Sequence, residues 1–522
     1  MEQPIMKYPI SVQSFATLRE ENFVYVDKTD LIYMLAQQHI CFLCRPRRFG
    51  KSLTISTLEA YFLGKKHLFK GLKIESLEKD WKIYPVFHID FNAADFSQPL
   101  GLENTLTDYI SRWEKQYGVE VNTDVSLGQR FALVLKKAHT DTGLRAVVLV
   151  DEYDKPILDV LATDMEEKNR NALKNFYSVF KLADADLRFV LLTGVTKFSQ
   201  VSVFSGFNQP YDISMNATYD SLCGITEQEL DVVFEDIIQQ MAQKFDVTTD
   251  GMRTILKKFY DGYHFSSELT DVYNPFSLLN TFANEELRNY WFGTGTPTYL
   301  LKLLSGTKTN MQQLLDREYA SEYFIDYRAD VEQPLPMLYQ SGYLTIKNVL
   351  RQEDGTLLYR LDYPNLEVKR GFITMLSQDY FASIDTTKSV VQQMVDCLHN
   401  ADIDKLHDLM NVFLGSIDYE MRKDKEYHFQ YTFYLIFSLL STYVVRVEQH
   451  NSQGRADLIV ETYKYIYIFE FKLDGTAKEA LQQIEDKQYA LPYTLDRRSI
   501  YKIGASFGKQ SGIIDDWKSV KL

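Results

Sequence analysis

The sequence predicts an α/β protein of several domains, and three observations support this fold class. Its 522 residues exceed what one ordinary core accommodates, so two to four domains are expected. Continuous apolar strand candidates alternate with helical patterns across residues 1–224, which is typical of a parallel sheet covered by helices on both faces. Strands and helices alternate again in residues 421–522, which predicts a second, smaller α/β domain.

The two α/β regions can be divided into elements by their apolar patterns. In residues 1–224 the predicted strands lie at 23–27, 39–44, 84–92, 144–154 and 187–199. In residues 421–522 we expect a helix at 427–443, strands at 444–449, 456–462 and 465–473, a helix at 477–493 and a strand at 499–507.

The middle of the chain is mainly helical. Residues 225–330 predict a helical lid, whose first helix should begin at a capping box formed by Thr226 and Glu229. Residues 331–420 predict a helix, a short hairpin around Asp354 and Gly355, and a second helix, followed by a helical connector. This order suits a small winged-helix-like module.

Composition excludes several classes of protein. No apolar run approaches the ~18–20 residues of a membrane span, and the N-terminus lacks the pattern of a secretion signal. Cys41 and Cys44 are three residues apart on a predicted strand and would face opposite sides, so we expect buried thiols in a cytoplasmic protein. The net charge of −14 argues against a chain coated with nucleic acid, although residues 420–522 are nearly neutral and compatible with DNA contact.

The stretch "CRPRRFGKSLT" ends like a phosphate-binding loop. Gly50, Lys51 and Ser52 complete the pattern G-x-x-x-x-G-K-S/T, in which the lysine reaches the outer phosphates and the hydroxyl binds Mg²⁺. Arg45 replaces the first glycine, and Pro46 is expected to shape the turn differently. The predicted nucleotide-binding residues of this stretch are Arg47, Phe49, Gly50, Lys51, Ser52 and Leu53.

Two further strands supply groups for the same site. Asp151 and Glu152 follow the apolar run "VVLV", as in a Walker B strand, so Asp151 would hold Mg²⁺ and Glu152 would polarise the attacking water. Thr193, at the tip of the next strand, could sense the terminal phosphate, as could Thr196. The strand at 84–92 comes between the two motifs along the chain, which implies an extra strand between the phosphate-loop strand and the Walker B strand. Each piece alone could be a turn, a cap or a strand end; together they favour an ATP site.

A second candidate site lies near the C-terminus. Asp457 begins one predicted strand, and Glu470 and Lys472 lie two residues apart on the next, so the last two share one face of an apolar strand. A charged pair on such a face is costly unless it is paired or functional. The two carboxylates suit Mg²⁺ or Mn²⁺, with Lys472 stabilising a phosphodiester as it is hydrolysed, and Glu448 is a candidate further acid. A cross-strand Glu–Lys salt bridge is the structural alternative.

Several segments together resemble the AAA-ATPase-like proteins of bacteria that carry a C-terminal nuclease-fold domain of the PD-(D/E)XK type. They are "RPRRFGKSL", "YVDKTDLI", "VVLVDEYDKPI", "LTGVTKFSQ", "YDGYHF", "VYNPFSLLN" and "YWFGTGTPTYL". The resemblance implies an ATPase domain of the AAA type, an arginine-rich phosphate loop as the usual form, and residues 25–28 near the nucleotide. It also implies supporting roles for Gln483 and Tyr489. A glutamate usual on the first nuclease helix has no secure match, with Asp424 and Glu426 nearest.

We therefore expect an ATP-hydrolysing protein whose ATPase domain gates or positions a Mg²⁺-dependent nuclease acting on nucleic acid, with DNA as the favoured substrate. One alternative is an ATP-dependent switch whose nuclease fold binds nucleic acid or a protein without cleaving it. Another is a nuclease whose nucleotide domain serves only stability. A homo-oligomer with an arginine finger is also compatible with the sequence, and Arg188, Arg253 and Arg288 are candidates.

Overall fold

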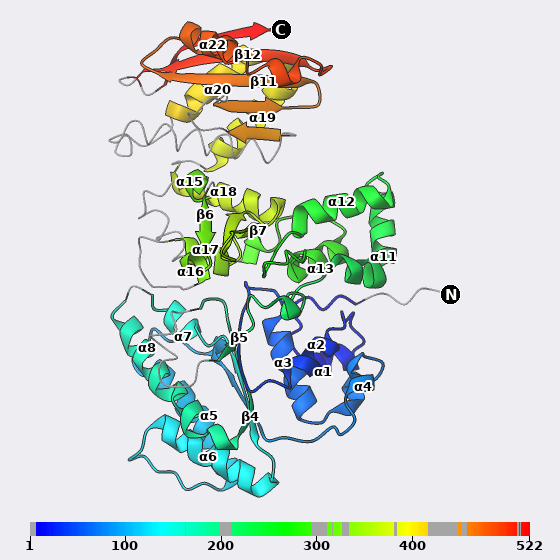
Figure 1. Ribbon diagram of the computed structural model, residues 1–522, viewed down its shortest axis with the longest axis vertical. Helices are drawn as coiled ribbons and strands as arrows, with labels where there is room; N and C mark the ends of the chain where they lie inside the picture. Colours follow the sequence, from blue (N-terminus) through cyan, green and yellow to red (C-terminus); the bar gives the residue numbers. More distant parts are fainter. Residues whose placement is uncertain are drawn as a thin grey trace. The chain divides into compact units, whose positions relative to one another are not determined.

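The computed structural model describes residues 7–161, 163–197, 210–294, 311–315, 317–325, 334–380, 384–415, 446–449, 457–508, 511 and 513–522 (Figure 1). The chain divides into two compact units, Met1–Val368 and Lys369–Leu522. Within the described residues, no helix is both long and apolar enough to cross a bilayer.

A five-stranded parallel sheet forms the centre of the first unit. Its strands are β1 (Ile40–Cys44), β2 (Val86–Asp90), β3 (Ala146–Asp151), β4 (Leu187–Gly194) and β5 (Tyr211–Asp212). Their order across the sheet is β2-β3-β4-β1-β5, with every pairing parallel. A strand does separate the phosphate-loop strand β1 from the Walker B strand β3, but it is β4. The strand that comes between them in the sequence, β2, lies at the edge, because it pairs with β3 alone.

Helices cover both faces of this sheet, as the apolar strands predict. Helices α1 to α4 lie on one face and α5 to α8 on the other (Figure 1). The helices are α1 (Phe15–Glu20), α2 (Thr29–Leu35), α3 (Lys51–Phe62), α4 (Ile74–Leu77), α5 (Gly101–Tyr117), α6 (Leu127–Thr142), α7 (Lys155–Leu158), α8 (Asp164–Tyr177) and α9 (Val179–Leu182). The strand expected at 23–27 is absent, since this segment makes only one bridge, between Phe23 and Lys7.

The region predicted as a lid, called the lid below, contains α11 (Glu227–Lys244), α12 (Thr249–Tyr260) and α13 (Pro275–Asn284) among its described residues. The predicted capping box is present: the Thr226 side chain accepts from the Glu229 backbone, and the Glu229 side chain accepts from the Thr226 backbone. The buried core of these helices also receives Tyr8, Val24 and Val26. The N-terminal segment therefore packs against the lid.

The predicted helix, hairpin and helix follow the lid. They are α17 (Leu335–Gln340), β7 (Thr345–Arg351), β8 (Leu357–Asp362) and α18 (Leu366–Tyr380), with the turn at Gly355. A short strand not foreseen from the sequence, β6 (Glu318–Ala320), extends the sheet to the order β6-β8-β7, and α15 (Met311–Leu315) and α16 (Glu322–Ile325) flank it. All pairings in this sheet are antiparallel.

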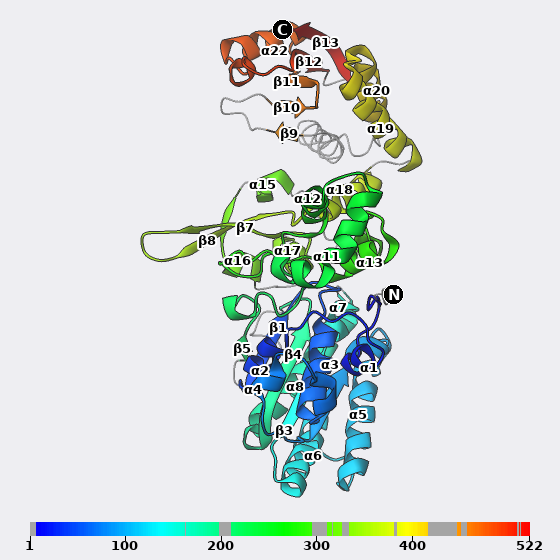
Figure 2. The same cartoon turned by 90° about the vertical axis from the view of Figure 1, so that its right-hand side faces the viewer.

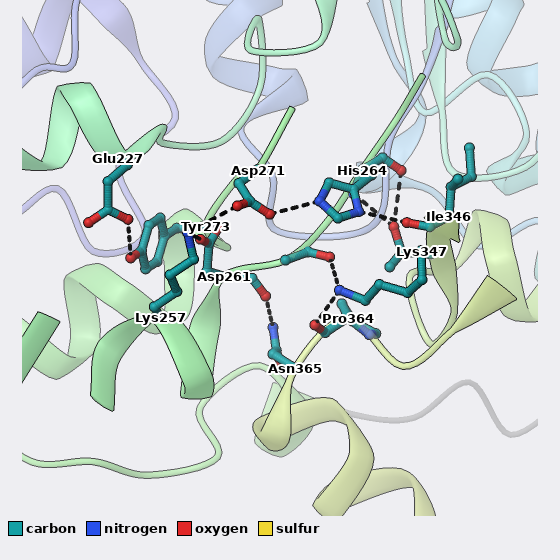
Figure 3. Close-up of polar contacts among 12 residues, drawn as sticks. Glu227, Lys257, Asp261, His264, Asp271, Tyr273, Ile346, Lys347, Pro364 and Asn365 are labelled. Atoms are coloured by element: carbon teal, nitrogen blue, oxygen red, sulfur yellow. Dashed lines mark hydrogen bonds and ion pairs between the residues drawn. The ribbon is translucent and has the colours of Figure 1, made fainter. Parts of the chain in front are cut away.

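A buried polar network joins the lid to β7 (Figure 3). His264 lies with Nδ1 2.6 Å from the Ile346 carbonyl oxygen and Nε2 2.7 Å from Asp271 Oδ1. The Lys347 amine donates to the carbonyl oxygens of Gly262 and Pro364, at 2.6 and 2.9 Å. These contacts come from the segment "YDGYHF" and fix it to the hairpin.

The second unit is a mixed sheet with helices on both faces (Figure 2). Its strands are β9 (Arg446–Gln449), β10 (Leu458–Glu461), β11 (Tyr465–Leu473), β12 (Ser499–Phe507) and β13 (Ile514–Lys521), in the order β13-β12-β11-β10-β9. Only β11 and β12 pair in parallel, and α22 (Ala477–Asp486) connects them. The edge strand β13 was not foreseen. The expected helix at 427–443 lies outside the described residues, as do Asp424 and Glu426.

The other face of this sheet is covered by α19 (Ile384–Asn400) and α20 (Ile403–Gly415). The Tyr467 hydroxyl on β11 donates to the Leu398 carbonyl oxygen at 2.6 Å, and Asn411 Oδ1 accepts from the Ile514 backbone at 2.8 Å. The division between the units at residue 368 places these helices with the C-terminal sheet. The sequence suggested a connector ending at residue 420.

Candidate nucleotide and metal sites

The phosphate loop turns into α3 at Gly50. This residue has φ +94°, a left-handed conformation that glycine adopts without strain. No atom lies within 4 Å of where a Cβ would stand, so the strain of any other residue here would come from the backbone alone. The first N–H groups of α3 have no partner within the helix, which is the usual basis of phosphate binding. Ser52 lies in this first turn and is partly exposed.

The Lys51 amine lies across the loop. It donates to the carbonyl oxygens of Arg45 and Pro46, at 3.1 and 3.2 Å, and its side chain is 4% exposed. Its nitrogen is 4.0 Å from Glu152 Oε1. The predicted phosphate-binding lysine, at the start of α3, and the predicted catalytic acid, just after β3, are thus brought together.

Two acids at and just after the end of β3 accept hydrogen bonds from threonines at and just after the end of β4. Asp151 is 2% exposed, and the Thr193 hydroxyl donates to its Oδ1 at 2.6 Å. Asp154 accepts from the Thr196 backbone and hydroxyl, at 2.6 and 2.8 Å. Burial, reinforced by the charge of Glu152, raises the pKa of Asp154 to about 6. The link between Asp154 and Thr196 was not predicted, because both residues lie beyond their strand ends, where the path of the chain depends on tertiary contacts.

A cavity opens beside the loop on the lid side. It is lined by Gly50, Leu53 and Thr54 of the loop and α3, by Tyr25, Val26 and Lys28 of the N-terminal segment, and by Cys223, Gly224 and Leu279 of the lid region. Its walls are mainly apolar with a few polar groups, the usual character of a small-molecule site. The Lys28 amine is 2.5 Å from Glu229 Oε2, and burial lowers its pKa while Glu229 opposes this effect.

The other predicted residues of the phosphate loop differ in how exposed their side chains are. The Phe49 ring is 1% exposed and packs edge-on against Tyr263, so only its backbone can face a nucleotide. Leu53 borders the cavity. Arg47 and Arg48 are exposed, whereas Arg45 is 1% exposed and its side chain is unavailable to a phosphate.

In the second unit, the strand register brings the predicted C-terminal residues together. Leu458 pairs with Phe469, which places Asp457 beside Glu470. Asp457 Oδ2 accepts from the Phe471 backbone at 2.8 Å, and the Lys472 amine is 3.4 Å from Glu470 Oε1. From α22, the Gln483 amide donates to Glu470 and accepts from Lys472.

The electrostatics of this cluster suit a cation. Burial, reinforced by the charge of Asp457, raises the pKa of Glu470 to about 7, and burial also raises the pKa of Asp457. Two adjacent carboxylates taken out of water are stabilised by a divalent cation, for which oxygen is the preferred ligand. The donor set therefore fits Mg²⁺ or Mn²⁺. Within the described residues, however, no three His, Cys, Asp or Glu side chains gather as a ligand set.

Tyr489 and Glu448 are the two remaining residues predicted for this C-terminal site. Tyr489 is 8% exposed, packs with Ile484 in the core beneath α22 and hydrogen-bonds Gln483. The backbone of Glu448 on β9 pairs with Ile459. The side chain of Glu448 lies outside the described part of the chain.

Comparison with known proteins matches an N-terminal and a C-terminal region of the chain to family models. Residues 9–204 match the family model described as "Predicted AAA-ATPase", and residues 424–517 match that of the PD-(D/E)XK nuclease superfamily. A relative from Azotobacter chroococcum mcd 1, described as an uncharacterized protein in the vnfD 5′ region, is 37% identical over 517 residues, which is 97% of each chain. The chain belongs to the AAA-ATPase-like family with a C-terminal PD-(D/E)XK nuclease-superfamily domain.

Two solved structures were also matched to this AAA-ATPase-like protein. One is the Aeropyrum pernix Orc1 protein in complex with DNA, with 12% identity, 67% of this chain and 91% of that chain covered, and a TM-score of 0.22. The other is Cdc6p from Pyrobaculum aerophilum, with 13% identity, 69% and 94% coverage, and a TM-score of 0.23. At these TM-scores neither adds to the family assignment.

Proposed function

We propose that this AAA-ATPase-like protein hydrolyses ATP and uses the nucleotide to gate or position a metal-dependent nuclease, with DNA as its substrate. The observation that carries the proposal is the convergence of Asp457, Glu470, Lys472 and Gln483 in one cluster, in a chain that also assembles Lys51 with Glu152. In this proposal residues 1–224 bind the nucleotide, 225–330 form a lid over it, 331–420 hold the winged-helix-like module and connector, and 421–522 form the nuclease domain.

The ATP site has a defined task for each group. Lys51 and the N–H groups of α3 would bind the phosphates, and Ser52 and Asp151 would hold Mg²⁺, which supplies positive charge to the phosphates. Glu152 would accept the proton of the attacking water. Thr193 fixes the orientation of Asp151 through its hydroxyl. The cavity lined by Tyr25, Val26 and Leu279 would receive the nucleoside.

The ATPase test compares wild-type protein with Lys51→Ala and Glu152→Gln. Wild type should bind and hydrolyse ATP. Lys51→Ala should lose binding, whereas Glu152→Gln should still bind ATP and hydrolyse it about 100-fold more slowly or worse, since it lacks only the general base. Binding is measured by calorimetry and hydrolysis by phosphate release. Absence of turnover in wild type would reject hydrolysis and leave a nucleotide switch.

The nuclease cluster also has defined tasks. A divalent cation held by Asp457 and Glu470 would supply an activated water and charge stabilisation. Lys472 would stabilise the negative charge that develops on the phosphate. Gln483 holds Glu470 and Lys472 in place through its amide.

The nuclease test uses plasmid DNA and single-stranded RNA with Mg²⁺ or Mn²⁺. Glu470→Gln and Lys472→Met should lower cleavage by about 100-fold or more, as expected when a group acting on the transition state is removed. Glu461→Gln is the matched control: Glu461 is a buried acid on β10 that pairs with Arg498 outside the cluster. Cleavage that survives both cluster variants would reject this site.

A second candidate function is nucleic-acid or protein binding without cleavage, under ATP control. It is favoured by the presence of only two carboxylates in the described cluster, Asp457 and Glu470. Binding of DNA by wild type with no cleavage under either metal would support it.

A homo-oligomer in which a neighbouring copy supplies an arginine to the ATP site is also part of the proposal. Arg253 is already engaged by Asp231 and Glu235, whereas Arg288 is 67% exposed beside Glu286.

A further inference from the structure

The phosphate loop is enclosed by residues that come from the segments "YDGYHF", "VYNPF", "YWFG" and "SGY". The sequence singled out most of these segments. Pro275 of "VYNPF" lines the cavity proposed for the nucleoside, but the loop-contacting residues of these segments have no assigned part in the ATP site or the nuclease cluster. They contact each loop residue from Arg45 to Phe49 at least once. The contacting residues are Phe265, Gly342, Trp291, Phe276 and Tyr263.

Arg45 makes the most extensive of these contacts. Its guanidinium donates to the carbonyl oxygens of Cys44 and Ser214 at 2.9 and 2.7 Å, and to that of Tyr219 at 3.1 Å. Its central carbon lies 4.1 Å from the centre of the Phe265 ring. An arginine can hold several carbonyl oxygens at once while stacking on an aromatic face, which a lysine cannot reproduce. Arg45 thus ties the end of β1, the segment after β5 and the lid region together.

The remaining loop residues are held from the same side. Trp291 Nε1 donates to the Arg47 carbonyl oxygen at 3.1 Å, and the Arg48 guanidinium lies 5.0 Å from the Phe276 ring centre. Gly342, at φ +86°, allows Pro46 to approach so closely that a Cβ on this glycine would lie 2.7 Å from Pro46 Cβ. The loop is therefore shaped by packing against it.

This packing bears directly on the phosphate-binding amine. The Lys51 amine is bound by the carbonyl oxygens of Arg45 and Pro46, so the path of these two residues sets its position. The usual first glycine allows a sharp turn but does not fix it. In this chain the turn is fixed by external contacts.

We propose that Arg45, together with Phe265 and Trp291, is a positioning residue that holds the phosphate loop in its nucleotide-binding shape and replaces the missing glycine. The inference rests on the proposed ATP binding. Affinity for ATP then depends on lid residues that never touch the nucleotide. Because coupling is reciprocal, bound ATP should in turn strengthen the contacts of Phe265 and Trp291 with the loop.

The test measures ATP affinity of the full-length chain by calorimetry. Arg45→Met keeps the buried volume but removes the donors, and Phe265→Leu keeps the burial but removes the ring face. Each should weaken ATP binding by about 10-fold or more. Arg45→Lys should fall between wild type and Arg45→Met. If Arg45→Met does not fold, Phe265→Leu carries the test alone.

Arg19→Met is the matched control. The Arg19 guanidinium also donates to two backbone carbonyl oxygens, of Leu68 and Lys70, but away from the loop. It should lower thermal stability without changing ATP affinity. The proposal is overturned if both Arg45→Met and Phe265→Leu bind ATP within about twofold of wild type. Such a difference is smaller than the free energy that one such contact contributes.

Tryptophan emission gives a readout that loss of stability would not imitate. ATP should change the emission of the wild-type protein, and Trp291→Phe should abolish this change while the emission of the other tryptophans remains. An ATP-induced change that persists in Trp291→Phe would contradict the proposal. If wild type does not bind ATP at all, the proposed nucleotide function fails and this inference falls with it.

Discussion

Asp261 follows α12 in the network between the lid and β7, and it is 1% exposed (Figure 3). The Lys257 amine is 3.6 Å from its Oδ2, while Asp271 and Glu227 add negative charge nearby. Burial, reinforced by these two acids, raises the pKa of Asp261 to about 7. This shift could not be predicted from the local residues, because the burial of Asp261 depends on contacts between the lid and the hairpin.

The raised pKa predicts a pH dependence of stability. An unfolded aspartate titrates near pH ~3.9. Between that pH and about 7 the folded protein binds the extra proton, so the free energy of unfolding falls as pH rises through this window. Asp261→Asn should remove this slope and be more stable than wild type at pH 8, with the difference shrinking towards pH 5. Urea denaturation at both pH values measures it.

Asp236→Asn is the control for this prediction, because Asp236 is exposed on α11. It should leave the pH dependence as in wild type. A difference between Asp261→Asn and wild type that is constant from pH 5 to 8 would contradict the assignment.

The other site residues differ in whether their local pattern predicts their position. Glu470 and Lys472 share one face of their strand because strand side chains alternate, and the structure places them together as this alternation predicts. Gln483 came only from the family resemblance, because the turn of α22 that brings it to Glu470 depends on tertiary packing. Asp154 was not connected to Thr196 for the same reason.

At the scale of elements, α5 and α6 are joined by a buried ion pair. Arg130 Nε and Nη2 donate to the two carboxylate oxygens of Glu114 at 2.8 and 2.7 Å, and both side chains are at most 7% exposed. Removing one partner of such a pair leaves an uncompensated buried charge, whereas replacing both with apolar groups does not.

This ion pair gives a prediction for the helix pair. Arg130→Met should lower the free energy of unfolding by about 3–5 kcal/mol, because Glu114 is left buried and unpaired. The double variant with Glu114→Leu should recover a large part of that loss. Urea unfolding of wild type, the two single variants and the double variant measures both effects. A double variant as unstable as the sum of the single variants would show that the two residues act independently.

The helices and strands that could be predicted have a recognisable pattern in their own residues, and those that were missed do not. Strands β1, β3 and β4 are continuously apolar, and the lid helix α11 has a capping box, so each could be assigned from its own residues. Strand β13 is mostly polar and lies at the sheet edge, and β5 is two residues long. Segment 23–27 looks like a strand but packs against the lid instead.

At the scale of the whole molecule, the chain consists of two compact units, one with the phosphate loop and one with the Asp457–Glu470 cluster. If the nucleotide gates the nuclease, ATP must change the cleavage rate, since coupling between sites is a free energy that both ligands share. We expect ATP to change cleavage by wild type by about 5-fold or more. Lys51→Ala should cleave at the nucleotide-free rate with or without ATP. A plasmid-cleavage time course measures this.

Equal cleavage by wild type with and without ATP would reject gating, even if both activities exist. If wild type also shows no ATP turnover, the alternative in which the nucleotide domain serves only stability is favoured. In that case ATP should still raise the unfolding temperature of wild type, because a ligand that binds only the folded state stabilises it.

The sequence by itself determined the two α/β regions, the candidate residues of both sites and the family, because these depend on short apolar runs, strand alternation and motif spacing. Only the tertiary structure decided the strand order that places β4 between β1 and β3, the grouping of α19 and α20 with the C-terminal sheet, and the fate of Arg45. Each of these depends on contacts between segments far apart in the chain. Arg45, which replaces the usual first glycine of the loop, is one example. Its guanidinium is held by the carbonyl oxygens of Ser214 and Tyr219 and by the ring of Phe265.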